Sequence, residues 1–276
     1  MKKITFLLVA FMATIFSACS SDNDNDGKNE TPKYDCKITI QTSADEIGLG
    51  QILKISYTLS KPATEYYFED EAGNKVYNKK ELEWKPTALG EQKLKFVASN
   101  GSEEVTEYKT IKVITCDMGV GRWDDSNAYI KQCEENSLTT NSSGMLRYKI
   151  KGGERVYQFD GDKLNRGYDS FEYEYTTSIE SNLWLCIDIY RQHLDKIKKE
   201  YGEPTSYTDD IYSFTRNYVN EPGDVLYEAQ RIINGGHDIR YEFNSNRTKI
   251  ECSLSKKYNS SYAWASRLVI SYKQNK

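Results

Sequence analysis

The sequence of 276 residues is poor in the side chains that most often carry out catalysis. It contains two histidines, His193 and His237, and six cysteines that show no C-x-x-C spacing. A zinc site formed by closely spaced cysteines is therefore not expected. A Ser-His-Asp or Cys-His site is not expected either, because no G-x-S-x-G segment or other nucleophile motif occurs. We interpret His193 as a residue at the surface or boundary of a helix, and His237 as part of a turn.

The chain also has no long apolar run near its start. Ile4–Phe16 is mostly apolar and uncharged, but it is shorter than the roughly 20 residues that a membrane-spanning helix needs. Two lysines precede it and small residues follow it, so the segment predicts a secretory signal over 1–18. Ser17-Ala18-Cys19 resembles the lipobox of bacterial lipoproteins. The resemblance implies cleavage before Cys19 and acylation of that cysteine, which would attach the protein to a membrane. An ordinary cleaved signal and a soluble periplasmic protein remain the alternative.

The segment that follows is acidic. Asp22, Asp24, Asp26 and Gly27 match the opening of an EF-hand calcium loop, but Lys33 stands where the loop needs a bidentate Glu. We therefore predict no metal here and a disordered acidic tether over 19–33. Acidic residues directly after a lipidated cysteine also resemble the export signal of some Gram-negative lipoproteins. The expected location is the outer membrane with surface exposure, and the periplasmic face stays open.

Excess positive charge is lacking as well. The formal net charge is −4, and loss of the two signal lysines would make the mature chain more acidic. A nucleic-acid partner is therefore not expected, and no cofactor motif occurs. Tyrosine is abundant at 22 residues, which favours β structure because aromatic side chains suit strands.

Residues 34–115 are predicted to form a β-sandwich. Leu53, Ile55, Tyr57 and Leu59 alternate with polar residues, which indicates a strand with one buried face. Other short strands are expected at 37–41, 64–69, 75–78, 92–98 and 108–114, separated by turn residues. Trp84-x-Pro86-x-Ala88-Leu89-Gly90-Glu91, Lys93–Ala98 and Thr110–Val113 resemble the Ig-like and PKD-like modules of bacterial surface proteins. The resemblance implies a spacer or adhesion scaffold without catalytic residues, and Trp84 is expected in the core.

Residues 116–276 are predicted to form an α+β domain that interacts with a partner. Asp125-Ser126 starts a short helix with Ser126 as N-cap, and Leu183 to Tyr201 recur at helical spacing up to Gly202. A further helix is expected at 225–233. Strands are expected at 145–151, 155–160, from 163 onward, and at 239–244, 248–254 and 263–272. Gly152-Gly153 predicts a hairpin turn.

A helix followed by hairpin strands therefore occurs twice. The segments from Tyr129-Ile130-Lys131-Gln132 to Leu164, and from Leu194 to Tyr272, resemble the BamE/SmpA-type and β-lactamase-inhibitor-like modules. The resemblance implies helices packed on one face of small antiparallel sheets, in a tandem arrangement. That family includes assembly factors and inhibitors, and the fold alone conveys neither role.

The cysteine pairings remain open. Cys186 and Cys252 are the best candidates for a disulfide, because a helix packed on the last strands could bring them together. Two buried free thiols are the alternative, and Cys116–Cys133 is a further candidate for a local bridge. Cys36–Cys116 is not expected, because the two ends of a sandwich tend to lie far apart.

Two kinds of functional surface can be proposed from the sequence. Tyrosines and a tryptophan in loops could stack on sugar rings or on a protein, or could instead fill the sheet face: Tyr207, Tyr212, Tyr258, Tyr262 and Trp264. Acid pairs occur at Asp209-Asp210, Asp124-Asp125 and Asp160-x-Asp162, and a glycoside hydrolase would need such a pair.

The sequence thus predicts a non-enzymatic, lipid-anchored envelope protein. It would bind an unknown protein or glycan partner through its second domain. The alternative is a small hydrolase of surface glycan or peptidoglycan that uses a carboxylate pair not identified by any motif.

Overall fold

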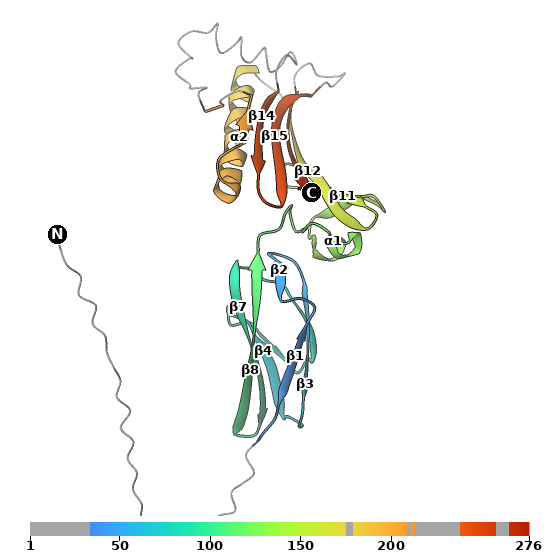
Figure 1. Ribbon diagram of the computed structural model, residues 1–276, viewed down its shortest axis with the longest axis vertical. Helices are drawn as coiled ribbons and strands as arrows, with labels where there is room; N and C mark the ends of the chain where they lie inside the picture. Colours follow the sequence, from blue (N-terminus) through green and yellow to red (C-terminus); the bar gives the residue numbers. More distant parts are fainter. Residues whose placement is uncertain (1–33, 175–178, 209–210, 213–237, 258–264, 276) are drawn as a thin grey trace, which may run out of the picture.

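A computed structural model describes residues 34–174, 179–208, 211–212, 238–257 and 265–275. At 173–174, 179–186, 256–257 and 265–266 only the backbone is described. The signal, the tether with Cys19, His237 and the helix expected at 225–233 lie outside these residues. Figure 1 shows an elongated molecule in which a β-sandwich and a larger sheet follow one another along the long axis.

The β-sandwich consists of two sheets that face each other. The smaller sheet has the order β1-β3-β6, with β1 at Ile38–Thr42, β3 at Leu53–Leu59 and β6 at Glu81–Trp84. The larger sheet has the order β2-β8-β7-β4-β5 and comprises β2 (Glu46–Gly48), β8 (Glu103–Ile114), β7 (Gly90–Asn100), β4 (Glu65–Glu69) and β5 (Lys75–Tyr77). Pairing is antiparallel except between β2 and β8. The strands expected from alternation are all present, and β2 and β6 are additional.

The core of the sandwich follows from the alternation. Leu53, Ile55 and Tyr57 of β3 point inward and meet Leu94 and Phe96 of β7, all with at most 2% of their surface exposed. Trp84 belongs to the same core, as expected. Both sheets therefore use one face for internal packing, which is the usual way for a sandwich to bury apolar surface.

The second part of the chain forms one eight-stranded antiparallel sheet with the order β13-β14-β15-β16-β12-β11-β10-β9. Its strands are β9 (Ser137–Ser142), β10 (Met145–Ile150), β11 (Gly153–Asp160), β12 (Lys163–Glu174), β13 (Ser206–Tyr207), β14 (Ile239–Asn244), β15 (Thr248–Lys257) and β16 (Ala265–Gln274). The two helices are α1 (Asn127–Cys133) and α2 (Ile179–Tyr201). Each helix precedes four strands, and the last strands of the two sets, β12 and β16, pair at the centre.

Both helices pack on the same face of this sheet. Register places Leu146, Tyr157, Gly167, Tyr272 and Ile250 in one row across β10, β11, β12, β16 and β15. This row joins the cluster around α1 to the cluster around α2, because Tyr272 packs against both. The α2 contribution comes from one helical stripe, which consists of Ile187, Tyr190, Leu194 and Ile197.

The local helix signals are confirmed. The side chain of Ser126 accepts a hydrogen bond from the backbone N of Tyr129 at 3.2 Å, which is an N-cap. α2 ends before Gly202, whose φ of +86° is the left-handed conformation that favours glycine. Gly152 has φ +80° in the turn between β10 and β11, in agreement with the predicted hairpin.

The predicted fold class is wrong. The structure is mostly β, with 56% strand, 12% helix, three sheets and two helices among the described residues, rather than a sandwich followed by an α+β domain. The helices occupy a small share of the second part, and its strands form one continuous sheet in place of separate small ones. The reason is the pairing of β12 with β16, whose residues lie about a hundred positions apart in the chain.

The two parts meet at a junction that is rich in hydrogen bonds. Gln51, which is 2% exposed, donates from Nε2 to the carbonyl oxygen of Val120 at 2.8 Å and to Asp125 Oδ2 at 2.6 Å. Arg122 Nη2 lies 2.8 Å from Glu46 Oε1. The hydroxyl of Tyr129 donates to the carbonyl oxygen of Ile52 at 2.9 Å. These contacts connect β2 and the β2–β3 loop of the sandwich to α1 and the loop before it.

Candidate functional site: the helix-free face of the eight-stranded sheet

The second face of the eight-stranded sheet has no helix on it among the described residues. Its side chains alternate with the core residues of each strand and are mostly polar: Arg240 and Glu242 on β14, Lys249 and Glu251 on β15, Ser271 and Lys273 on β16, Arg166 and Tyr168 on β12, and Glu154 and Gln158 on β11. An antiparallel sheet can keep one face in water in this way. We call this surface the helix-free face.

Three cations lie side by side on the helix-free face. Register pairs Arg166 of β12 with Lys273 of β16, and Lys273 with Lys249 of β15. Gln158 and Asn244 extend the same row on either side. We call these five residues the basic row. Arg166 and Lys273 are exposed, and neither has a carboxylate within ion-pair distance among the described residues.

Three other cations in or near the row each pair with a carboxylate. Lys249 Nζ lies 3.1 Å from Glu242 Oε2, and Arg240 Nε lies 3.6 Å from Glu251 Oε1. Arg147 of β10 pairs with Glu154 of β11. Arg166 and Lys273 differ from these three cations, because neither has a carboxylate within ion-pair distance among the described residues.

A hollow of about 470 Å³ opens on the same face over β10, β11 and β12. Arg147, Glu154, Ser170 and Glu172 line it together with the Gly152-Gly153 turn. Gly153 is needed there because a Cβ atom would lie 2.1 Å from the carbonyl oxygen of Ser170. The hollow is polar and mixed in charge.

The opposite face carries a buried ionic cluster. Arg155 Nε and Nη2 donate to the two carboxylate oxygens of Asp169 at 2.7 and 2.8 Å, and Arg155 Nη1 lies 3.8 Å from Glu134 Oε2. Tyr157 donates its hydroxyl to Glu134 at 2.7 Å. Burial by itself lowers the pKa of Arg155, but the hydrogen bonds and charge of Asp169 outweigh it and hold the pKa above its usual value. The guanidinium therefore stays charged, and the cluster links α1 to the sheet instead of exchanging protons.

The Gly119-x-Gly121 loop closes over this cluster. Gly119 has φ +55°, and a Cβ atom on it would lie 2.4 Å from both Arg155 Nη1 and the Tyr157 hydroxyl. The glycine thus allows close contact with an ion pair.

In each of the two described acid pairs, one member, Asp125 or Asp162, holds local structure. Asp125 Oδ2 accepts from the backbone N of Arg122 at 2.7 Å as well as from Gln51, and burial raises its pKa against these hydrogen bonds. Asp162 Oδ1 accepts from the backbone N of Asn127 at the start of α1, at 3.1 Å. Asp209 and Asp210 lie outside the described residues.

The predicted aromatic surface is only partly described. Tyr207 is 58% exposed at the edge strand β13, and its ring stacks on that of Tyr241 at 5.4 Å between centroids. Tyr212 is half-buried, donates its hydroxyl to Asp195 at 2.7 Å, and has Lys198 Nζ 4.4 Å from its ring centroid. Tyr258, Tyr262 and Trp264 lie outside the described residues, so a shared surface stays a prediction.

Four described cysteines are buried and free: Cys36, Cys116, Cys133 and Cys252. Burial raises the pKa of Cys116 to about 12, which makes its thiol unreactive at neutral pH. The Cys116–Cys133 bridge is not formed. The predicted Cys186–Cys252 disulfide is wrong, because Cys252 is a free thiol enclosed in the core of the second part.

His193 lies on α2 with its ring 4.6 Å from that of Phe171, measured between centroids. It is half-buried at the boundary between helix and sheet, as expected. Burial lowers its pKa, and nearby Lys196 lowers it further.

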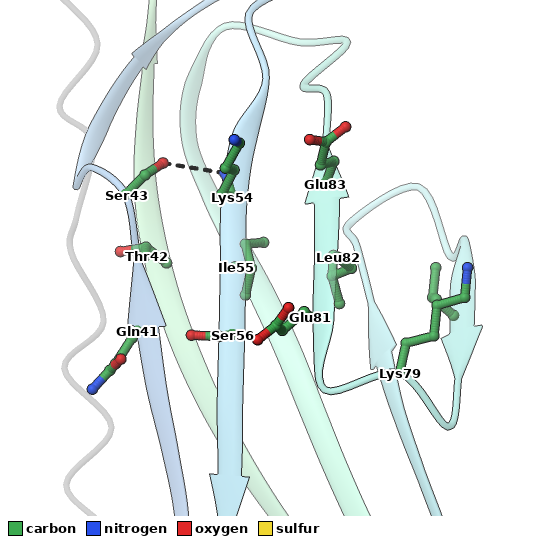
Figure 2. A pocket seen from close by; sticks show the side chains of 11 residues that line it. Gln41, Thr42, Ser43, Lys54, Ile55, Ser56, Lys79, Glu81, Leu82 and Glu83 are labelled. Atoms are coloured by element: carbon green, nitrogen blue, oxygen red, sulfur yellow. Dashed lines mark hydrogen bonds between the residues drawn. The ribbon is translucent and has the colours of Figure 1, made fainter.

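The sandwich has a groove of its own, with a volume of about 880 Å³. Figure 2 shows that it crosses β1, β3 and β6 and reaches Lys79. Ile55, Val76 and Leu82 supply its apolar part, and Lys54, Lys79, Glu81 and Glu83 its charges. Ser43 accepts a hydrogen bond from the backbone N of Lys54 at 3.1 Å (Figure 2). This mixture of charges favours no particular ligand.

Among the described residues, no group of three or more His, Cys, Asp or Glu is placed to hold a metal ion. Neither described helix is long and apolar enough to cross a membrane. Comparison with known proteins adds no relative. No protein family and no curated protein sequence matches this chain.

Proposed function

We propose that the protein is a lipid-anchored component of a bacterial cell envelope that binds a partner without catalysing a reaction. The helix-free face is its binding surface, and the partner is a glycan or a protein. The sandwich acts as a spacer between the membrane anchor at Cys19 and this surface.

The unneutralised cations of the helix-free face are the observation that carries the proposal. A polar sheet face in water is common and indicates no function by itself. Arg166 and Lys273, however, lie opposite each other without an acidic partner among the described residues. Like charges that face each other across a strand pair are destabilising. A ligand of opposite charge accounts for their position.

The way in which the two parts are joined supports the same proposal. The sandwich uses one face of each sheet for its core and is joined to the second part through Gln51 and Tyr129, which are held by hydrogen bonds. A joint held in this way presents the helix-free face in a defined orientation, which reduces the entropy lost on binding.

The anchor is tested by metabolic labelling with a palmitate analogue. We expect the full chain to incorporate the label and Cys19→Ala to lose it. A matched control is Cys252→Ser, which changes a buried cysteine and should keep the label. Labelling of Cys19→Ala would contradict lipidation at this position.

Display is tested with a cysteine introduced on the helix-free face. In Ser271→Cys, an impermeant maleimide should label intact cells as strongly as lysed cells if the face is outside the cell. Labelling only after lysis would place the face inside the envelope. It would contradict surface display while leaving the anchor untouched.

A further inference from the structure

The basic row has a geometry that suits a linear polyanion. Its members lie on neighbouring strands, in the order Gln158, Arg166, Lys273, Lys249 and Asn244. Neighbouring strands are about 4.8 Å apart, so the three cations span roughly 10 Å and the whole row roughly 19 Å. The row runs across the strands, and a ligand lying along it would meet a cation at each step in its centre and an amide at each end.

The charges of the row are unbalanced as well as aligned. Lys249 has Glu242 at 3.1 Å, whereas Arg166 and Lys273 have no carboxylate within ion-pair distance among the described residues. In the next row of the same face, Glu242 and Glu251 also lie opposite each other, but each of them is paired with a cation. Glu242 and Glu251 are therefore neutralised, whereas the charges of Arg166 and Lys273 remain available to a ligand.

We propose that the basic row binds an anionic polysaccharide whose sugars carry carboxylate or sulfate groups. This inference rests on the proposed function, because it names the ligand class of the same face. The guanidinium of Arg166 would bind an anionic group with two hydrogen bonds, and the lysines would bind others as point charges.

The flanking side chains favour a sugar over a protein. Protein interfaces depend on aromatic or other large apolar side chains in a desolvated centre. The basic row instead places amides at both ends of the cations, and Gln158 and Asn244 can donate to and accept from sugar hydroxyls. Tyr168, two residues along β12 from Arg166, lies next to the row on the same face and offers a ring and a hydroxyl.

The experiment measures binding of the full chain, in detergent, to defined polymers at low salt. The probes are polygalacturonate and heparin as anionic polysaccharides, dextran as a neutral one, polyglutamate as an acidic peptide, and single-stranded DNA. We expect binding to polygalacturonate or heparin that weakens steeply with salt, and no binding to dextran.

The variant Arg166→Gln/Lys273→Gln should weaken this binding by at least about tenfold, because it removes two charge-assisted contacts. The control Arg240→Gln removes a cation of the same face that is already paired with Asp238 and Glu251. The affinity of this variant for the acidic polysaccharide should change by less than about threefold. Both substitutions are on exposed residues, and thermal melting of each variant would show that the fold is kept.

Three outcomes would overturn the inference. Equal affinity of the double variant and the wild type would show that the row is not the site. Tighter binding to polyglutamate or DNA than to either acidic polysaccharide would reject the ligand class. Binding to dextran that is unaffected by both variants would reject the row but keep a glycan-binding function for the protein. Release of shortened sugars during the assay would contradict the non-enzymatic function itself.

Discussion

The sandwich and the eight-stranded sheet use their surfaces in different ways. In the sandwich, two sheets pack face to face, and Leu53, Ile55, Leu94 and Phe96 from both sheets meet in one core. In the second part, one large sheet packs its core face against α1 and α2 and leaves its other face without a helix among the described residues. Both sheets of the first part therefore serve its own core. In the second part, one broad sheet face is left for the binding that we propose.

The largest expected effect comes from the buried ion pair of the second part. Asp169→Ala should lower the free energy of unfolding by about 3–5 kcal/mol, because it leaves the enclosed guanidinium of Arg155 without its bidentate partner. Urea denaturation, monitored by tryptophan fluorescence, measures this free energy of unfolding. The control Glu154→Ala breaks the more exposed pair with Arg147 and should cost less than about 1 kcal/mol. Equal losses would mean that the buried cluster is not a stabilising feature.

The second-largest effect is expected at the junction between the two parts. Gln51→Ala should lower the free energy of unfolding by about 2 kcal/mol, since the buried carboxyl of Asp125 loses a hydrogen-bond donor inside the junction. Small-angle scattering should also show a wider range of angles between the two parts. Gln132→Ala, which removes an exposed hydrogen bond to Glu83 at the same junction, is the matched control and should change both measurements little. An unchanged scattering profile for Gln51→Ala would contradict a role for this residue in holding the parts together.

A gain in stability is expected from one tyrosine in each part. The hydroxyls of Tyr57 in the sandwich and Tyr148 in the sheet are buried without a hydrogen-bond partner among the described residues. Tyr57→Phe and Tyr148→Phe should each raise the free energy of unfolding by about 1 kcal/mol, because an unsatisfied polar group no longer has to leave water. Tyr157→Phe removes a hydrogen bond to Glu134 and should instead lower the free energy of unfolding. A loss in stability for Tyr148→Phe would indicate that its hydroxyl has a partner.

The smallest expected effect depends on pH and is confined to the second part. Burial lowers the pKa of His193 in the folded state below its ordinary value of 6.5. The unfolded state therefore takes up a proton first as the pH falls, and stability that is present above pH 6.5 is lost between that value and the lower folded pKa. Urea midpoints measured on both sides of this window should differ less for His193→Phe than for the wild type. An equal change of the urea midpoint with pH in both proteins would show that His193 does not cause this pH dependence.

The basic row shows why sequence analysis missed the candidate site. Arg166, Lys249 and Lys273 are ordinary polar positions of three strands, and the overall negative charge of the chain gives no sign of them. Only the register of β12, β16 and β15 brings them together. Tyr207 and Tyr212 are prominent in the sequence, and the structure adds their partners: Tyr207 stacks on Tyr241, and Tyr212 donates its hydroxyl to Asp195.

The sequence alone determined the individual elements. The alternation of Leu53, Ile55 and Tyr57 defines a strand with one buried face, and Ser126 and Gly202 mark a helix start and a helix end, because periodicity and capping depend on residues close in the chain. The tertiary structure decided how the strands assemble. Pairing of β12 with β16 turned the predicted α+β domain into one continuous sheet and placed three cations side by side. Such pairing depends on contacts between residues far apart in the sequence, and no local pattern specifies which strands will meet.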